Sequence, residues 1–382
     1  MFKRLVKNYI DDAIELSDFI TDNPEVGSKE FKASNKHVDL LRKNGIKVEY
    51  PYKNIPTAFH GVINEGKKPR FGILVEYDAL RGMGHACGHS ASGAISTLAA
   101  LMLNEIREEF QGEINIYGTP DEEINGGKVY LAKDGAFEGL DAAIMIHLSD
   151  ESCVYSPMLA LDAMIFEFFG TPSHAAAAPW EGKNAFNAMR LVFDAMDMIR
   201  QHVTDDVRMH GYIINAGEAS NIVPDYCKGE FCVRGKNEKT LQYVYDWLLD
   251  IGKAAGIMTK TEFKMTPLGE RFYELSSKKT GEELLSELFL SNGFELTDRS
   301  RDVSGSSDIG NVDYICPAFH PMISIRAPYK PHTVEFEKEM KTDNVHQAIE
   351  GGGIIIAEFL YKLSQEPEIL NKIKEEHKKN RS

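Results

Sequence analysis

Three side chains with metal-binding or nucleophilic chemistry alternate in the segment GHACGHS, residues 84–90: His85, Cys87 and His89. In an extended segment, side chains two residues apart project to the same side, whereas on a helix they do not face each other. The spacing therefore predicts a strand end or loop with one side directed at a chemical partner. Three kinds of site fit this pattern: a metal site, a redox thiol, and a nucleophile with its base.

Further acidic and imidazole side chains follow segments that have the pattern of strands. These segments, each a short apolar or alternating run, are 70–80, 112–127 and 140–150. The polar residues near their ends are Asp78, Glu122, Glu123 and His147. In an open α/β sheet, ligand sites form outside the carboxyl ends of the strands. We therefore expect these side chains and the Cys/His segment to converge at one edge of a sheet.

The elements that must hold this edge follow the order of an α/β domain. Amphipathic helical patterns at 9–20 and 91–110 alternate with the strand-like segments, which predicts a mixed, mostly parallel sheet sandwiched by helices. From about residue 162 the order becomes strand, helix, two or three strands and helix, which is typical of an inserted, smaller α+β domain. We expect a first domain in two parts, 1–162 and 271–382, around an insertion at 163–270.

Composition narrows the class of protein and its partners. The 382 residues are 26% charged and 43% hydrophobic with a net charge of −15, so neither nucleic acid nor an anionic membrane is expected as a partner. No apolar run reaches the ~18 residues of a membrane span, and the start lacks the apolar core of a signal peptide. Five scattered cysteines argue against a disulfide framework. We expect a cytoplasmic protein.

The donor types favour a site for a divalent metal. Thiolate, imidazole and carboxylate groups bind zinc, and mixed sets also suit manganese, cobalt or nickel. The candidate ligands are Cys87, His89, Glu123, His147 and His332. In the adjacent glutamate pair, Glu123 would bind metal while Glu122 stays free as a general base. Other interpretations stay open: solvated glutamates, a buried structural His147, or Cys87 as a nucleophile beside His89; no CxxC redox motif is present.

Six motifs resemble, in their order, those of M20-family metallopeptidases: GHACGHS, TPDEE, the strand ending at His147, SHAAAAPWEGKNA, NIVPD followed by Arg234, and GSSDIGNV with PHTVEF. The HACGH form is similar to the amidohydrolase branch of that family. EYDAL with GMGHACGH and GSSDIGNVDY is most similar to its p-aminobenzoyl-glutamate hydrolase and M20-domain dipeptidase group. The resemblance extends from about residue 20 to about residue 360, and motifs in this order are specific together, although each alone is weak.

The resemblance implies a catalytic domain that binds two divalent metal ions (zinc, manganese or cobalt) and an inserted lid domain that also forms a homodimer. It implies that Cys87 bridges the metals and that the other ligands are His89, Glu123, His147 and His332. Glu122 would be the general base and later the proton donor. His174 of the lid, from the same protomer or its partner, would stabilise the oxyanion. Asn221 and Arg234 would contact the substrate's carboxylate or backbone.

Three positions depart from the family pattern. Ser90 stands where the branch often has Asp, Arg81 replaces the proline of DALP, and Glu76 stands where other branches have a metal-binding His. We predict a metal-dependent hydrolase of the amide bond in a small N-acyl or aryl-amide amino acid or a dipeptide. The alternatives are a catalytically silent small-molecule binder that keeps the fold, and a hydrolase that uses the Cys87 thiol.

Overall fold

Two units make up the chain in the computed structural model. The residues that it describes are 1–299 and 305–381. The units are Met1–Pro157 with Leu275–Ser382, and Met158–Glu274. The second unit begins before strand β7, Ala160–Phe169, because this strand pairs along its whole length with a strand of the same unit. The expected insertion, 163–270, lies inside the second unit.

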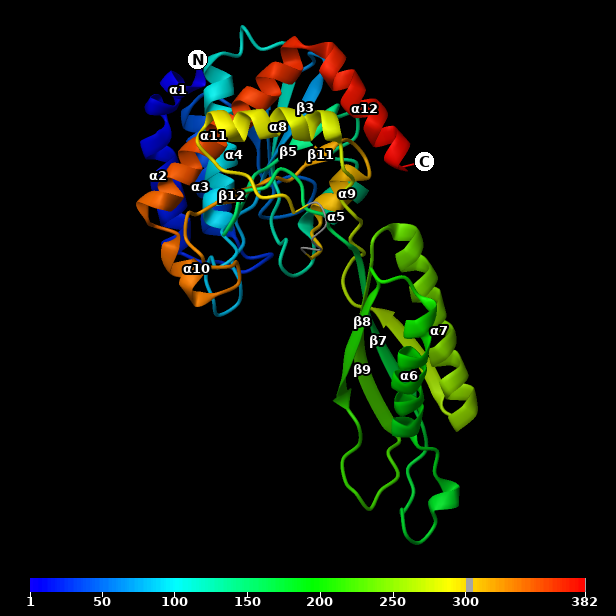
Figure 1. The fold of residues 1–382 in the computed structure, drawn as a ribbon. Helices are drawn as coiled ribbons and strands as arrows, with labels where there is room; N and C mark the ends of the chain where they lie inside the picture. Colours follow the sequence, from blue (N-terminus) through cyan, green and yellow to red (C-terminus); the bar gives the residue numbers. More distant parts are fainter. Residues whose placement is uncertain (300–304, 382) are drawn as a thin grey trace. The chain divides into compact units, whose positions relative to one another are not determined.

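A six-stranded sheet forms the centre of the first unit, in the order β1-β2-β4-β3-β5-β11 (Figure 1). Its strands are β1 Lys47–Glu49, β2 Phe59–Ile63, β3 Arg70–Val75, β4 Glu113–Gly118, β5 Ala142–Ile144 and β11 Ala318–Phe319. β4 and β5 run parallel to β3, and β11 runs parallel to β5, whereas β2 pairs antiparallel with β1 and β4. The prediction of a mixed, mostly parallel sheet is confirmed. Apart from Arg70, the residues of β3, β4 and β5 are buried, as expected for central strands of an α/β sheet.

Two short strands continue the sheet beyond β5 and β11. β6, His147–Ser149, pairs in parallel with β12, Met322–Ser324. Between the two pairs, the backbone N–H of Met145 donates to the carbonyl of Phe319 (3.1 Å), so the ladder is continued across the break. His147 therefore lies just past the carboxyl end of β5.

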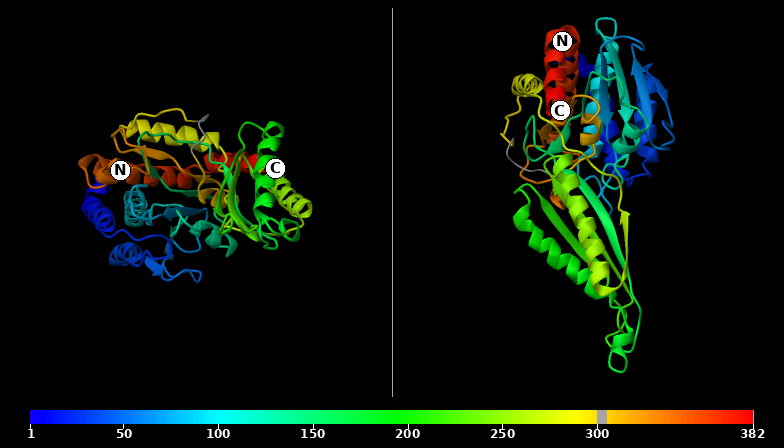
Figure 2. Two further views of the ribbon diagram at one scale, coloured as in Figure 1. Left: turned by 90° about the horizontal axis from the view of Figure 1, so that it is seen from below. Right: turned by 90° about the vertical axis from the view of Figure 1, so that its right-hand side faces the viewer.

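Helices surround this sheet in the first unit, some in direct contact with its strands and others outside them (Figures 1 and 2). They are α1 Phe2–Leu5, η1 Val6–Asn8, α2 Ile10–Asp22, α3 Phe31–Lys43, α4 His89–Glu105, α5 Gly127–Lys133, α8 Lys279–Ser291, α9 Ile309–Asp313, α10 Val334–Glu339, α11 Asp343–Gln365 and α12 Pro367–Arg381. The central helix α4 contacts β3, α2 and α11 and is almost entirely buried, as expected for a helix that is apolar on most sides. Gly88 precedes it in a left-handed conformation (φ 88°), where a Cβ would lie 2.9 Å from the Leu148 side chain. Gly88 thus lets the Cys/His segment turn directly into α4.

The second unit has its own sheet and its own hydrophobic core. Its elements are β7, η2 Pro179–Glu181, α6 Ala185–Ile199, η3 Arg200–His202, β8 Arg208–Asn215, β9 Tyr226–Gly235, α7 Glu238–Thr259 and β10 Glu262–Pro267. The strands are antiparallel in the order β10-β7-β9-β8, and α6 and α7 both pack on β7 and β9 (Figure 2). The sequence pattern did not indicate β10. No helix among the described residues has the length and hydrophobicity needed to span a membrane.

Candidate metal centre and active site

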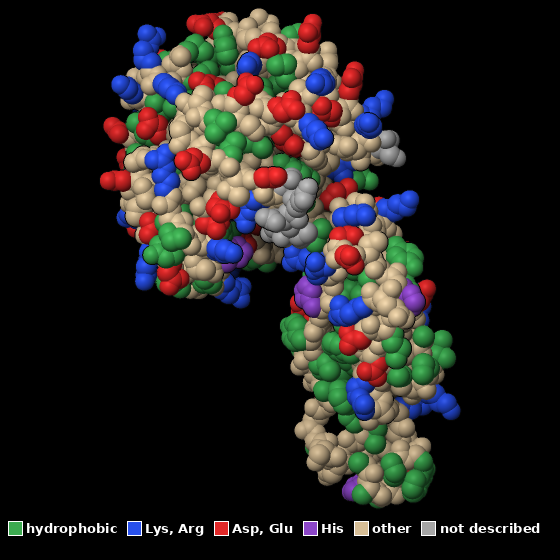
Figure 3. Space-filling view, in the orientation of Figure 1, with side chains coloured by type: hydrophobic (Ala, Val, Ile, Leu, Met, Phe, Trp, Pro, Cys, Tyr) green, Lys and Arg blue, Asp and Glu red, His purple; other side chains and the backbone are tan. Residues whose placement is uncertain are grey.

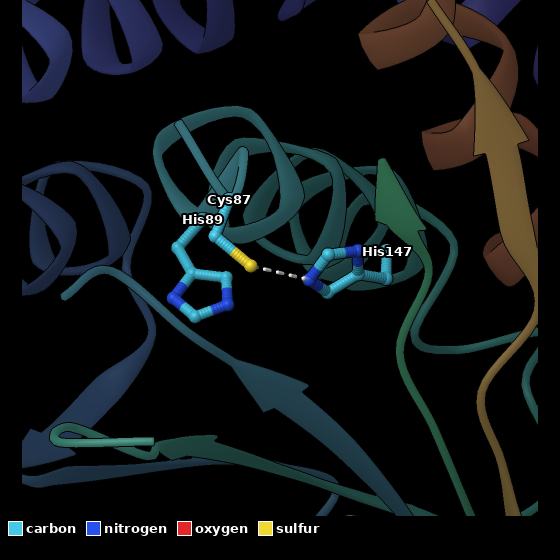
Figure 4. A group of neighbouring side chains, drawn as sticks. All are labelled: Cys87, His89 and His147. Atoms are coloured by element: carbon cyan, nitrogen blue, oxygen red, sulfur yellow. Dashed lines mark hydrogen bonds between the residues drawn. The ribbon is translucent and has the colours of Figure 1, made fainter. Parts of the chain in front are cut away.

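The Cys87 thiol lies between two imidazoles that come from distant parts of the chain. Its Sγ is 3.4 Å from Nε2 of His147, at the start of β6, and 3.3 Å from Nε2 of His332, which precedes α10. Figure 4 shows His89 and His147 beside the thiol, with His89 at the first position of α4. The loop before α4 thus brings Cys87 and His89 to the same place as the carboxyl end of the sheet.

Two carboxylates organise His89 and Glu123. The Nδ1–H of His89 donates to Oδ1 of Asp78 (2.9 Å), and the other oxygen of Asp78 accepts from the backbone N–H of Glu123 (2.9 Å). The carboxylate of Glu123 in turn lies 3.5 Å from Nε2 of His332 and 4.0 Å from Nε2 of His89. Asp78 therefore orients two of the predicted ligands at once, which is the common arrangement around metal-binding histidines.

The spacing of these donor atoms fits divalent cations. Neighbouring ligand atoms of one tetrahedral zinc lie about 3.3–3.6 Å apart, given Zn–N bonds of about 2.0–2.1 Å and Zn–S bonds of about 2.3 Å. Donor atoms gather within 4.8 Å of one another in three overlapping sets, and two of these sets share Cys87. We call the set of Cys87, His89 and His147 the inner group and the set of Cys87, Glu123 and His332 the outer group. The five predicted ligands are thus brought together, with Cys87 shared by both groups.

Glu122 lies beside the ligands, and its environment differs from that of Glu123. A carboxylate oxygen of Glu122 is within 4.8 Å of donor atoms of His89 and Glu123. Burial, and then the charges of Asp308 and Glu123, raise the pKa of Glu122 well above its ordinary value. Burial also opposes ionisation of Glu123, but hydrogen bonding with His332 and the charge of His89 lower its pKa to about 2. Glu123 is thus held in the ionised form that a metal ligand needs, whereas Glu122 binds a proton more readily.

A buried ion cluster next to the inner group was not predicted from the sequence. Lys128, the third residue after Asn125 in NGGKV, donates to Oε1 of Glu76 (2.5 Å) and to Oδ1 of Asp308 (2.7 Å), and all three side chains are at most 1% exposed. Burial opposes ionisation of Glu76, but the charges of Lys128 and His89 lower its pKa to about 2. A glutamate at the end of a buried apolar strand needs a positively charged partner. This requirement is the one feature of the sequence that could have indicated a buried lysine beside Glu76.

A further imidazole near the site was also missed. His320 follows β11, is 4% exposed, and its ring lies 5.4 Å from the ring of His147. Neither ring nitrogen of His320 has a hydrogen-bond partner among the described residues. Burial lowers its pKa to about 3, so the ring is neutral. The strand before His320 has only two residues, so the sequence shows no strand pattern that would have indicated this histidine.

The remaining predicted site residues lie in the second unit. Nδ1 of His174 accepts from the backbone N–H groups of Ala176 (3.2 Å) and Ala177 (3.1 Å). The carbonyl of Asn221 accepts from the N–H of Ala175 (2.9 Å), so Asn221 lies next to His174. Both belong to loops beyond the Tyr226 end of β9. Arg234 is at the opposite end of this strand. The rise of about 3.3 Å per residue places it about 26 Å from Tyr226 along the strand. The structure brings His174 and Asn221 together, but not Arg234.

The sheet and the donor groups at its carboxyl edge define an α/β protein with a candidate metal centre. The chain belongs to peptidase family M20/M25/M40, whose model matches residues 74–349. It is 32% identical to the Xaa-Arg dipeptidase of Mus musculus over 88% of this chain and 83% of that protein. It is 30% identical to a p-aminobenzoyl-glutamate hydrolase chain of Escherichia coli (strain K12), over 67% of this chain and 59% of that one. The predicted family is confirmed, and the chain is a hydrolase of that family.

Solved structures share the fold. An aminobenzoyl-glutamate utilization protein from Klebsiella pneumoniae superposes with a TM-score of 0.74 at 17% identity, covering 95% of this chain and 99% of that one. A dinuclear metal-binding peptidase of the M20 family from Bacillus subtilis superposes with a TM-score of 0.69 at 19% identity, covering 92% and 99%. At these identities the likeness concerns the fold alone.

Proposed function

We propose that the protein is a dinuclear metal-dependent amidohydrolase or dipeptidase that cleaves the amide bond of a small N-acyl or aryl-amide amino acid or a dipeptide. The observation that carries this proposal is the pair of donor groups that share Cys87, with the Glu122 carboxyl group beside them. The names of two relatives, an Xaa-Arg dipeptidase and a p-aminobenzoyl-glutamate hydrolase, favour amides of an amino acid. Zinc, manganese and cobalt all suit this mixture of sulfur, nitrogen and oxygen donors.

The five ligands divide into the inner and outer groups, and each group would hold one divalent ion. Bound there, divalent cations polarise a carbonyl group and lower the pKa of water to about 7. The carboxylate of Glu122 takes the proton from the attacking water as the new C–O bond forms. Glu122 then gives this proton to the amide nitrogen as the C–N bond breaks, so one carboxyl group acts as base and acid in turn.

His174 has a hydrogen-bonding state that suits oxyanion stabilisation. Because Nδ1 accepts two backbone N–H groups, the ring proton is on Nε2, which is left as a donor. A preorganised donor to a tetrahedral oxyanion typically contributes ~3 kcal/mol to the transition state. We assign this role to His174, and contacts with the substrate's carboxylate or backbone to Asn221 and Arg234.

We propose that the second unit also forms a homodimer. A single second unit holds His174 and Arg234 at opposite ends of β9, too far apart for one small substrate. A dimer would resolve this, because one protomer would supply Arg234 and its partner the histidine and asparagine. β8 is an edge strand with Tyr212 56% and Ile214 45% exposed, which suits pairing between copies. Figure 3 shows hydrophobic side chains exposed on this unit.

A thiol-dependent hydrolase is the weaker alternative. Burial raises the pKa of the Cys87 thiol well above its ordinary value. A cysteine nucleophile needs the thiolate, and reactive cysteines therefore have lowered pKa values. Three imidazoles surround the thiol: Nε2 of His147 and of His332 lie 3.4 and 3.3 Å from Sγ, and His89, with Nδ1 held by Asp78, turns its other nitrogen to it. These contacts favour a ligand role for Cys87.

The decisive experiment measures amine release from a panel of dipeptides, N-acyl amino acids and aryl-amide amino acids. The protein is loaded with zinc, manganese or cobalt, and each reaction is repeated with a chelator and, separately, after thiol alkylation in the presence of metal. We expect release that the chelator abolishes and that fresh metal restores. Release that survives chelation but not alkylation would support the thiol enzyme. Binding of a panel member without any release would support the silent binder.

A further inference from the structure

We infer that Glu76 is a fourth protein ligand of the inner group, so that protein atoms close this position while the outer group keeps an open one. The inference rests on the proposed dinuclear centre and adds to it an assignment for a residue that the sequence left without a role. Structural zinc sites are closed by four protein ligands, whereas catalytic sites have three and an open position. The two positions would therefore differ in how firmly they hold their ions.

The first observation is an unpartnered oxygen that lies beside His89 of the inner group. The Glu76 side chain is 1% exposed, and its Oε2 lies 3.4 Å from Nε2 of His89, the ring nitrogen opposite the Asp78 hydrogen bond. Within the described ranges, Oε2 accepts no hydrogen bond. The nearby His320 does not supply one, since neither of its ring nitrogens has a hydrogen-bond partner there. A buried carboxylate oxygen without a donor is costly, and a cation removes that cost.

The second observation is the charge around Glu76. Lys128 holds Oε1 at 2.5 Å and also contacts Asp308 at 2.7 Å, so its positive charge is balanced by Asp308. Because Lys128 fixes one oxygen, the other oxygen stays directed toward His89. Since Asp308 balances Lys128, the other charge that Glu76 faces is that of His89, and a bound metal ion would take its place. Together with the Cys87 thiolate, the Glu76 carboxylate would neutralise one divalent ion.

The third observation is the difference in exposure between the two groups. The side chains of Glu76 and His89 are each 1% exposed, and Cys87 is 8% exposed. In the outer group, the side chain of His332 is 54% exposed and that of Glu123 is 11% exposed. An ion bound to the inner group would have to break four contacts inside the protein to leave, whereas the outer ion borders solvent through His332.

The test measures how fast zinc leaves the whole protein. Zinc-loaded wild type, Glu76→Gln and Asp308→Asn are dialysed against a weak chelator, and zinc per protomer is followed by mass spectrometry. We expect the wild type to lose one zinc quickly and the second at least tenfold more slowly. Glu76→Gln should lose both quickly. Asp308→Asn keeps both oxygens of Glu76 but leaves Lys128 to Glu76 alone, so its second zinc should leave faster than in wild type and more slowly than in Glu76→Gln.

A slow zinc that persists in Glu76→Gln would overturn the inference, and so would equal losses in Glu76→Gln and Asp308→Asn. His332→Ala changes a side chain that is 54% exposed, and it provides a second test if Glu76→Gln does not fold. It removes an outer ligand only, so it should keep the slow zinc, and loss of that zinc would also overturn the inference. A wild type that binds no zinc, manganese or cobalt refutes the dinuclear centre itself. Zinc retention as expected without amide hydrolysis refutes only the proposed reaction.

Discussion

Asp78 is the residue whose replacement should weaken metal binding most without removing a ligand. Its two oxygens accept from Nδ1–H of His89 and from the backbone N–H of Glu123, each at 2.9 Å. Since both of these groups are hydrogen-bond donors, the side chain at position 78 has to provide two acceptor atoms. In Asp78→Asn, the amide offers one oxygen and one NH₂ group to these two donors.

The backbone N–H of Glu123 cannot change, so we expect the amide oxygen to stay with it and the NH₂ group to face His89. The imidazole then has to move its proton to Nε2, the nitrogen needed as a ligand, or lose a hydrogen bond to a charged group. Such a bond contributes about 1.5–3 kcal/mol. A loss of about 2 kcal/mol corresponds to about 30-fold in Kd. Substitution of partners behind metal ligands usually costs about 10–100-fold, which agrees.

Competition with a zinc indicator gives the Kd of the purified, metal-free variants. The matched control is Asp313→Asn, which removes a fully buried carboxylate that accepts from Ser276, Lys278 and Arg381 and contacts none of the proposed ligands. We expect it to lower stability and leave the Kd for zinc within about threefold. A Kd for Asp78→Asn within threefold of wild type would refute the reasoning, and so would equal weakening in both variants.

Three further predictions follow from the same contacts. Glu122→Gln should keep the zinc content of wild type and lower kcat about 10²–10⁴-fold, measured by metal analysis and amine release; retained turnover would exclude it as the base. Burial lowers the pKa of His37 to about 3, below its unfolded value of 6.5, so stability is full above pH 6.5 and falls below it. Compared with His37→Gln, wild type should lose about 2 kcal/mol more unfolding free energy between pH 7 and pH 5 in urea titrations, and parallel losses would contradict this. In Gly93→Ala, the new Cβ would lie 2.3 Å from the carbonyl oxygen of Glu76 and 3.0 Å from Nε2 of His37, so the unfolding free energy should fall by about 1–3 kcal/mol or more; an unchanged midpoint would contradict this packing.

The sheet and the convergence of the ligands could be predicted because they depend on local patterns. Apolar runs that end in polar residues mark the carboxyl ends of strands, and the alternation with helices makes those ends meet at one edge. Glu122 and His147 were assigned to this edge from their position alone. Cys87 and His89 followed from their spacing in a loop.

The missed features depend on contacts between distant segments. Nothing in NGGKV indicates that Lys128 is fully buried, because its partners come from the end of β3 and from the residue before α9. β10 was missed because it is a mostly exposed edge strand without an apolar run. Asn221 and Arg234 are 13 positions apart in the printed sequence, but Arg234 lies at the far end of the extended strand β9, whose near end follows the loop of Asn221.

The order Glu-Tyr-Asp at residues 76–78 explains how the two ring nitrogens of His89 come to face different carboxylates. Alternate side chains of an extended segment point to opposite sides, so Tyr77 donates to the carbonyl of Thr57 (2.6 Å) while Glu76 and Asp78 both face His89. Asp78 accepts a hydrogen bond from Nδ1–H, so Nε2 is the nitrogen whose proton a metal ion would displace. Since Glu76 lies on the Nε2 side, it is the one carboxylate of these two that can share a cation with this ring. Two carboxylates in alternation would thus set both the tautomer and the charge of the inner group.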